Sequence, residues 1–396
     1  MNTFRRMWAE IAAVGRQPGG GYLRYAFGEP ERALRGWFAR QARHRDMTVA
    51  EDGNGNLFAW WGSPDDGGAV LTGSHFDSVP HGGGYDGPLG IVSAFLAVDA
   101  LRADGYTPSR ALGVAAFAEE EGGRFGVPCL GSRLLTGALD PRRAAALSDA
   151  DGVTFAAALG GPPVGARPGL LGSLGAVVEL HIEQGRALVD AGAAVGVAST
   201  IWPHGRWRMD FTGTGDHAGT TRMADRRDPM LAFAATVLAA DEQARAAGAH
   251  ATMGRVAVSP NATNAIPSLV RGWLDARAAD PETLRELVGG VVKHAMARAE
   301  RDGTTLHVTE ESVTAEVRFD TGLAARLAAL LGGAPILPTG AGHDAGVLSG
   351  HVPTAMLFVR NPTGVSHSPA ERASDDDCEA GVAALATVLR ELTCGP

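Results

Sequence analysis

Residues 73–87, GSHFDSVPHGGGYDG, carry the residue types that could do metal chemistry. They follow an apolar run typical of a buried strand and precede residues 88–103, whose apolar spacing predicts a helix. His75 and Asp77 alternate at the strand end, so the Asp77 carboxylate can orient the imidazole while that ring binds a metal ion. Asp86, at the start of the helix, can place a second carboxylate beside the first ligand. Taken alone, the stretch fits a glycine-rich turn with an incidental histidine equally well.

The elements around this loop alternate between strand and helix. Apolar runs at 111–118 and 176–185 predict two further buried strands, and residues 129–137 have a helical pattern. This alternation is typical of an α/β fold with a largely parallel mixed sheet. The chemistry of such sheets lies beyond the carboxyl ends of the strands, and this chain places polar residues there. They are His75, Asp77, Asp86, Glu120, Glu121, His181, Glu183, His343, Asp344 and His367.

This set has the composition of a two-metal centre. Imidazole and carboxylate groups suit Zn²⁺ or Mn²⁺, and one carboxylate can bridge two ions. A single histidine is more often structural. Five strand-end loops that carry the same ligand chemistry favour a metal centre over chance occurrence.

The pattern of the chain changes between residues 204 and 315. The strands and helices of this segment are those of an antiparallel α+β domain, and the residues after it return to the first pattern. We therefore predict a catalytic domain split between residues 1–203 and 316–396, with an inserted second domain at 204–315.

Composition and charge exclude several classes of protein. The 396 residues are 45% hydrophobic, and the net charge of −9 argues against a nucleic-acid or anionic-membrane partner. Cys129, Cys378 and Cys394 are odd in number and form no CxxC pair, which suggests a reducing compartment without disulfides. Because no stretch is apolar enough to span a bilayer and no cleavage site is convincing, we expect a cytoplasmic protein with no membrane partner.

Seven motifs carry a family resemblance. They are GSHFDSVPHGGGYDG, EEEGGRF, ELHIEQG, GTGDHAGTTRMADRRDP, PNATNAIP, GAGHDA and SHSPAE, in the family's order from about residue 70 to 371. The chain resembles the hydantoinase/carbamoylase branch, which includes N-carbamoyl-L-amino acid hydrolases and allantoate amidohydrolases, of the dinuclear metal-dependent aminoacylase/carboxypeptidase superfamily. ELHIEQG and SHSPAE distinguish this branch from the dipeptidases and exopeptidases of the superfamily.

The resemblance implies two divalent metal ions per subunit, Zn²⁺ or Mn²⁺, with Co²⁺ or Ni²⁺ also permitted by the ligand types. His75, Asp86 and His181 would hold one ion. Asp86, Glu121 and His367 would hold the other, so that Asp86 bridges the pair.

The resemblance also implies the catalytic and substrate-binding residues. Glu120 would be the general base, and His217 would stabilise the oxyanion. Gln184, Asn264 and Arg277 would bind the substrate, with Arg277 as the bidentate partner of its carboxylate.

Three of these residues, His217, Asn264 and Arg277, fall in the inserted domain, whereas the metal ligands fall in the first. Catalysis would therefore require domain closure, which makes the insert a lid. Relatives commonly dimerise through the insert and sometimes supply groups across the dimer, so the resemblance implies a homodimer.

Four further residues leave alternatives open. Glu119 has no family role and is either a solvated or a structural carboxylate. His343 and Asp344 line or support the pocket, or belong to a purely structural loop. Arg222 replaces the proline of the family pattern HAGTTPM, and it either recognises a second carboxylate of an acidic substrate or is an exposed arginine.

The expected activity is hydrolysis of a linear non-peptide C–N bond in a small ureido acid, either an N-carbamoyl-L-amino acid or allantoate. The nearest alternative is an N-formyl-amino-acid deformylase acting, for example, on N-formylglutamate. A dipeptidase or aminoacylase with the same metals is less favoured, because Gln184 and Arg277 suit a compact ureido acid. An inactive metal-binding scaffold is a further alternative, and the presence of Glu120 argues against it.

Overall fold

The computed structural model describes residues 3–394, which fall into two compact units. The split unit comprises the residues up to Thr200 and those from Arg318 onward, and the insert unit comprises Ile201–Val317. The sequence patterns placed these boundaries at 203/204 and 315/316.

The split unit is built on a nine-stranded sheet. Its strands are β1 (Thr48–Glu51), β2 (Leu57–Trp61), β3 (Ala69–His75), β4 (Leu112–Phe117), β5 (Leu174–Ile182), β6 (Val195–Ile201), β13 (Val317–Arg318), β14 (Ile336–Thr339) and β15 (Thr354–Val359). Their order is β1-β2-β4-β3-β5-β15-β6-β13, with β14 paired to β6. Strands β4, β3, β5 and β15 are parallel, whereas β1, β2 and β6 pair in antiparallel fashion. The sheet is mixed, and its four central strands are parallel.

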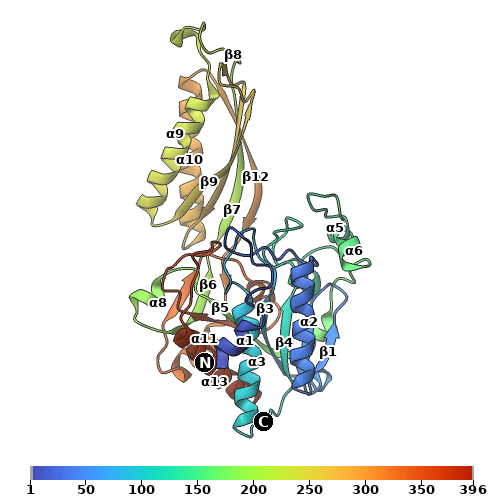
Figure 1. Cartoon of the computed structure of the whole chain (residues 1–396). Coiled ribbons are helices and arrows are strands. Elements are labelled where there is room, and N and C mark those ends of the chain that lie inside the picture. Colours follow the sequence, from blue (N-terminus) through green and yellow to red (C-terminus); the bar gives the residue numbers. More distant parts are fainter. Residues whose placement is uncertain (1–2, 395–396) are drawn as a thin grey trace. The chain divides into compact units, whose positions relative to one another are not determined.

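Helices cover both faces of this sheet (Figure 1). The helices of the split unit are α1 (Thr3–Ala9), α2 (Glu29–His44), α3 (Pro88–Ala103), α4 (Leu130–Thr136), α5 (Pro141–Ala145), α6 (Phe155–Leu159), α7 (Pro168–Ser173), α8 (Ala187–Asp190), α11 (Thr321–Leu330), α12 (Asp344–Leu348) and α13 (Asp375–Thr393), of which α5 and α6 lie to the side of the sheet. Successive residues of β3 face opposite sides. Val70 packs in the cluster that contains residues of α2, α3 and α13, and Leu71 packs with Leu135 of α4 and Leu348 of α12. Every residue of β3 is therefore buried.

The insert unit has an antiparallel sheet in the order β12-β7-β11-β9 and a small pair, β10-β8. These strands are β7 (His204–Thr212), β8 (Asp216–His217), β9 (His250–Ser259), β10 (Ala265–Ile266), β11 (Leu269–Arg277) and β12 (Thr305–Thr314). Two helices, α9 (Pro229–Ala247) and α10 (Pro281–Arg301), pack against each other and against the sheet (Figure 1). Phe211, Phe233 and Val291 join these layers in a core of their own.

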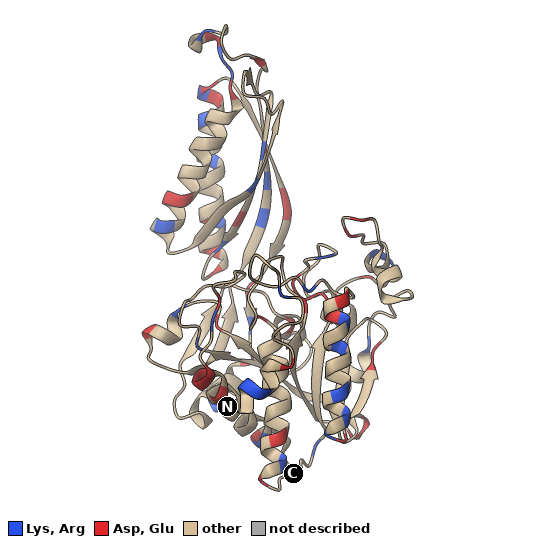
Figure 2. Ribbon diagram, viewed as in Figure 1, with Lys and Arg blue, Asp and Glu red and all other residues tan. Residues whose placement is uncertain are grey.

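The surface carries both signs of charge. Figure 2 shows basic and acidic residues interspersed along α2, α9 and α10. Cys129 and Cys378 are buried and Cys394 is exposed, and all three are free thiols. Among residues 3–394, no helix combines the length and apolarity that crossing a bilayer requires.

Candidate active site

Three parallel strands bring predicted ligands to one edge of the sheet in the split unit. β3 ends at His75, which lies in register with Phe117 at the end of β4. The loop after β4 carries Glu120 and Glu121, and β5 carries His181 as its penultimate residue. Because parallel strands end at the same edge, these side chains gather there although the chain separates them widely.

Asp86 lies between two groups of ligand atoms. Its Oδ1 is 3.4 Å from Nε2 of His75 and 3.2 Å from Nε2 of His181. Its Oδ2 is 3.6 Å from Nε2 of His367, which is also 3.2 Å from Oε2 of Glu121. His75, Asp86 and His181 thus form one group, and Asp86, Glu121 and His367 form the other. A carboxylate with one oxygen in each group has the geometry of a bridging ligand.

The two buried histidines are oriented to offer Nε2 to a metal ion. Nδ1 of His75 lies 3.0 Å from the backbone oxygen of Asp77, and Nδ1 of His181 lies 2.9 Å from that of Ile182. Both rings therefore donate through Nδ1, and both Nε2 atoms are buried without a hydrogen-bond partner. Leaving a buried polar atom unpaired costs about 1–3 kcal/mol. Ligands of a tetrahedral ion at about 2.0–2.1 Å lie about 3.4 Å apart, so this donor set fits a divalent cation.

The prediction that the Asp77 carboxylate orients His75 is wrong in its detail. Its Oδ1 is 3.6 Å from Nδ1 of His75, beyond hydrogen-bond range, and the Asp77 backbone oxygen accepts instead. The carboxylate accepts the backbone N–H groups of Glu120 at 3.1 Å and Glu121 at 3.0 Å. The strand ends at His75, so the alternation on which the prediction relied stops before Asp77. Asp77 therefore positions the two glutamates.

Glu120 lies beside the first ligand group without belonging to it. Its Oε2 is 3.7 Å from Nε2 of His75, and the Cys129 thiol donates to its Oε1 at 3.6 Å. Burial raises the pKa of Glu120 well above its usual range, against the opposing influence of His75. Oε2 of Glu120 therefore faces the ligand group while its Oε1 accepts from the thiol.

Glu119 is fully buried, which excludes the solvated alternative. Its Oε1 accepts the backbone N–H groups of Arg124 at 2.8 Å and Phe125 at 2.5 Å. Its own backbone is left-handed, with φ of 54°. Burial raises the pKa of Glu119 to about 8. These contacts make Glu119 a structural residue that shapes the loop after β4.

Two neighbouring side chains hold the Asp86 carboxylate. Gln184 Nε2 donates to Oδ2 of Asp86 at 2.8 Å and to Oγ of Ser366 at 3.0 Å, and the Ser366 hydroxyl donates to the same Asp86 oxygen at 3.3 Å. Gln184, predicted to bind substrate, thus contacts a ligand through its amide nitrogen. Its Oε1 is buried without a hydrogen-bond partner. Sequence reasoning missed Ser366, although it lies in the SHSPAE motif beside His367.

The GAGHDA loop lies at the same edge. The ring of His343 is 4.5 Å from that of His181, and both of its nitrogens are buried without a partner. Asp344 accepts a 2.5 Å hydrogen bond from the Ser132 hydroxyl. Burial lowers the pKa of His343 well below its usual range, so the ring is neutral. The loop borders the first ligand group, and of the two alternatives the structure favours the one in which it lines or supports the pocket.

The predicted substrate residues of the insert unit lie toward opposite ends of β11. His217 in β8 pairs with Ala265 of β10, next to Asn264 in the chain. β10 ends shortly before Leu269, the first residue of β11, so both residues lie near the start of that strand. Arg277 is the last residue of β11 and pairs with His204, near the point where the chain enters the unit. β11 has nine residues. At about 3.3 Å per residue its ends are about 26 Å apart. His217 and Asn264 lie together, and Arg277 lies far from both.

Carboxylates hold two arginines of the insert unit. Asp275 accepts from Nε of Arg277 at 2.9 Å and from an Nη at 3.3 Å, and it also accepts from Nε of Arg206 at 3.3 Å. Arg222 pairs with Asp225 at 2.7 Å, and its side chain is 82% exposed. This geometry favours the exposed-arginine interpretation of Arg222 over recognition of a second substrate carboxylate.

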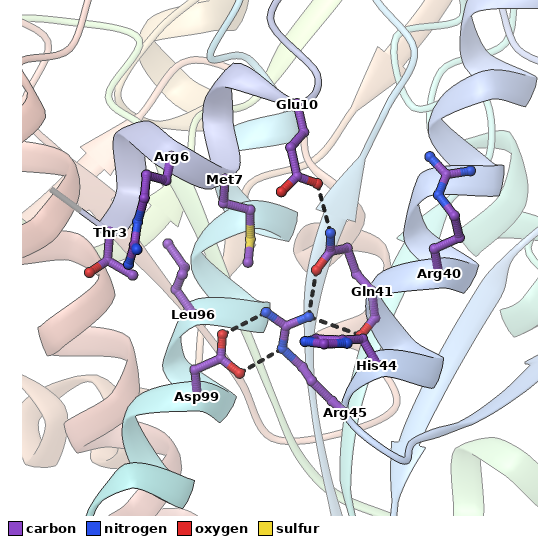
Figure 3. Close-up of a pocket in the computed structure, with 10 residues that line it drawn as sticks. All are labelled: Thr3, Arg6, Met7, Glu10, Arg40, Gln41, His44, Arg45, Leu96 and Asp99. Carbon is purple, nitrogen blue, oxygen red and sulfur yellow. Dashed lines mark hydrogen bonds and ion pairs between the residues drawn. The ribbon is translucent and has the colours of Figure 1, made fainter. Parts of the chain in front are cut away.

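A hollow of about 600 Å³ lies elsewhere in the split unit, among α1, α2 and α3 (Figure 3). Within it, Arg45 donates to Asp99 at 2.8 and 2.5 Å, and Gln41 donates to Glu10 at 2.8 Å. None of the predicted ligand or catalytic residues lines it. The hollow is therefore separate from the candidate centre.

Comparisons with known proteins find relatives along nearly the whole chain. The family described as Peptidase family M20/M25/M40 matches residues 71–391. An N-carbamoyl-L-amino acid amidohydrolase of Geobacillus stearothermophilus is 36% identical over 98% of this chain and 98% of its own. An allantoate amidohydrolase of Escherichia coli is 31% identical over 96% and 95% of the two chains. The crystal structure of a hydantoinase/carbamoylase family amidase from Burkholderia vietnamiensis has a TM-score of 0.88 at 30% identity and covers 99% of this chain and 98% of that one.

Proposed function

The chain belongs to the M20/M25/M40 peptidase family, whose members are metal-dependent, and we propose that it cleaves a linear non-peptide C–N bond in a small ureido acid. The observation that carries this proposal is Asp86, with one oxygen in each of two His/carboxylate groups. The names of its relatives, N-carbamoyl-L-amino acid and allantoate amidohydrolases, support a ureido substrate over an N-formyl or peptide substrate.

The chemistry follows from the residues around Asp86. The ligands would be His75, Asp86 and His181 for one ion and Asp86, Glu121 and His367 for the other. Divalent ions held there supply a Lewis acid for the scissile carbonyl and make water more acidic. Glu120 takes a proton from the attacking water on its carboxylate and returns it to the leaving nitrogen. Asp77 holds Glu120 by its backbone N–H, so the base keeps its place while the proton moves.

The insert unit supports a substrate site that two copies of the chain complete. Arg277, aligned by Asp275, suits bidentate binding of a substrate carboxylate. His217 and Asn264 lie near the other end of β11, whose nine residues span about 26 Å, which is further than a small ureido acid extends. We infer that Arg277 serves the metal centre of its own chain, whereas a second copy supplies His217 and Asn264 to it. The active form is then a homodimer.

The activity is tested with a substrate panel. Protein loaded with Mn²⁺ or Zn²⁺ is expected to release ammonia from allantoate or an N-carbamoyl-L-amino acid, and removal of the metal by a chelator is expected to abolish this release. N-formyl-L-glutamate and a dipeptide serve as the comparison substrates. Turnover of only these two compounds would keep the metal centre and reject the ureido class, and no turnover at all would favour the inactive scaffold.

Complementation tests the shared site. Glu120→Gln and His217→Ala proteins are each expected to be inactive, but their co-expression should restore about a quarter of wild-type activity. With random pairing, half of the dimers contain one copy of each variant. One of the two active sites in such a dimer carries neither change.

The matched control for this test co-expresses Glu120→Gln with Arg277→Ala. These two changes fall on groups that serve the metal centre of their own chain, so every mixed dimer carries a defect in both sites and no recovery is expected. If His217→Ala also fails to complement Glu120→Gln, a single chain completes its own site.

A further inference from the structure

Glu371, the last residue of SHSPAE, contacts the loop that carries Asp86. It is 6% exposed, and its Oε1 accepts the backbone N–H of Tyr85 at 2.9 Å and that of Asp86 at 3.0 Å. The two segments are 285 residues apart in sequence. One carboxylate oxygen from the C-terminal part of the chain thus binds two successive N–H groups at the proposed bridging ligand.

The glycine run before Asp86 makes room for this contact. A Cβ at Gly83 would overlap the carboxylate of Glu371. Any larger residue at this position would have to displace either the loop or the glutamate. The glycines therefore allow the approach of a side chain as well as the bend of the loop.

The same C-terminal loop contacts Asp86 at two further points. Ser366 donates to Oδ2 of Asp86, and His367 places its Nε2 3.6 Å from that oxygen. Ser366 and His367 thus act on the side chain, and Glu371 acts on the backbone. Asp86 needs both constraints, because each of its oxygens must face a different ligand group.

We propose that Glu371 is a positioning residue for the metal centre, and that it fixes the backbone at Asp86 so that one carboxylate can serve both ligand groups. This inference rests on the proposed two-metal site. It gives the loop 366–371 two roles, since the loop supplies the ligand His367 and also holds the bridging ligand in place. Outer partners that orient a ligand typically change metal affinity about 10- to 100-fold when they are removed.

The test measures metal affinity in the full-length protein, by competition for Zn²⁺ or Mn²⁺ with a chromophoric chelator. Glu371→Ala is expected to weaken metal binding about 10- to 100-fold. Glu371→Gln is expected to keep most of the affinity, because its amide oxygen can accept the same two N–H groups. Gly83→Ala should weaken metal binding to a similar extent, because the added methyl group displaces the Glu371 side chain. If Glu371→Ala does not fold, Gly83→Ala takes its place in the test.

Asp52 provides a matched control. It is buried, and its Oδ1 also accepts two backbone N–H groups, those of Asn54 at 2.8 Å and Asn56 at 3.1 Å. Asp52→Ala is expected to lower the melting temperature without weakening metal binding, because Asp52 contacts no proposed ligand. Wild-type affinity in both Glu371→Ala and Gly83→Ala, or an equal loss in Asp52→Ala, would reject the positioning role. A wild-type protein that binds neither metal would overturn the metal centre itself, and the role of Glu371 with it.

Discussion

A protein with glutamine in place of Glu120 is expected to lose about 10²- to 10⁴-fold in kcat, which is the usual contribution of a positioned general base. Glu120 belongs to neither ligand group, so the change removes the proton acceptor and leaves the proposed ligands in place. Glutamine has nearly the same shape and fits the buried position beside His75 and Cys129. The variant should therefore keep its fold, its metal content and its KM. Steady-state kinetics on the substrate found active, with elemental analysis of the purified protein, measure all three.

Glu119→Gln is the control for this experiment. Glu119 is adjacent and buried, but its Oε1 accepts the N–H groups of Arg124 and Phe125, a role that an amide oxygen can fill. We expect this variant to retain kcat within a few-fold. A Glu120→Gln protein as active as the wild type would reject the proposed mechanism, and a Glu119→Gln protein as impaired as Glu120→Gln would show that the loop rather than the base is the sensitive element.

The second large effect is expected from Asp86→Ala. Asp86 has one oxygen in each ligand group, so this change removes a ligand from both. Because residues that only support a ligand already contribute about 10- to 100-fold, the loss of a shared ligand should reduce activity on the order of 10³-fold or more. Elemental analysis after gel filtration should find fewer metal ions per subunit than in the wild type, because both ligand groups have lost a ligand. Circular dichroism and thermal unfolding would check that the variant is folded.

His367→Ala provides the graded comparison. His367 belongs to the group with Asp86 and Glu121 and contributes nothing to the group with His75 and His181. This variant should lose metal from one group and retain about one ion per subunit. If Asp86→Ala and His367→Ala lose the same amount of metal, Asp86 does not bridge two ions.

Much of the fold and of the metal set could be predicted from the chain alone. The apolar runs before His75, at 111–118 and at 176–185 predict buried strands, and the structure has β3, β4 and β5 there. Polar residues placed directly after buried strands must gather if the strands are parallel neighbours, and β3, β4 and β5 are. The short helices α5, α6 and α7 are not among the predicted elements, because five or six residues show too little periodicity.

The supporting contacts could not be predicted in this way. Asp77 was expected to orient His75 from its position two residues along the strand, but the strand ends first and the carboxylate binds Glu120 and Glu121. Gln184 was expected to bind substrate, and its amide nitrogen binds Asp86. In both cases the direction of a side chain beyond a strand end depends on loop geometry that no residue pattern encodes.

The sequence by itself determined which residues could bind metal, because that depends on side-chain type and on position at strand ends, and the family resemblance of its motifs implied which of them would be the base. Only the tertiary structure decided that Glu371 reaches Asp86 across 285 residues. It also decided that Arg277 ends β11 whereas His217 lies in the separate β10-β8 pair, near the start of β11. Such relations depend on strand register and on the packing of distant loops, which are set by the whole folded chain rather than by any local pattern.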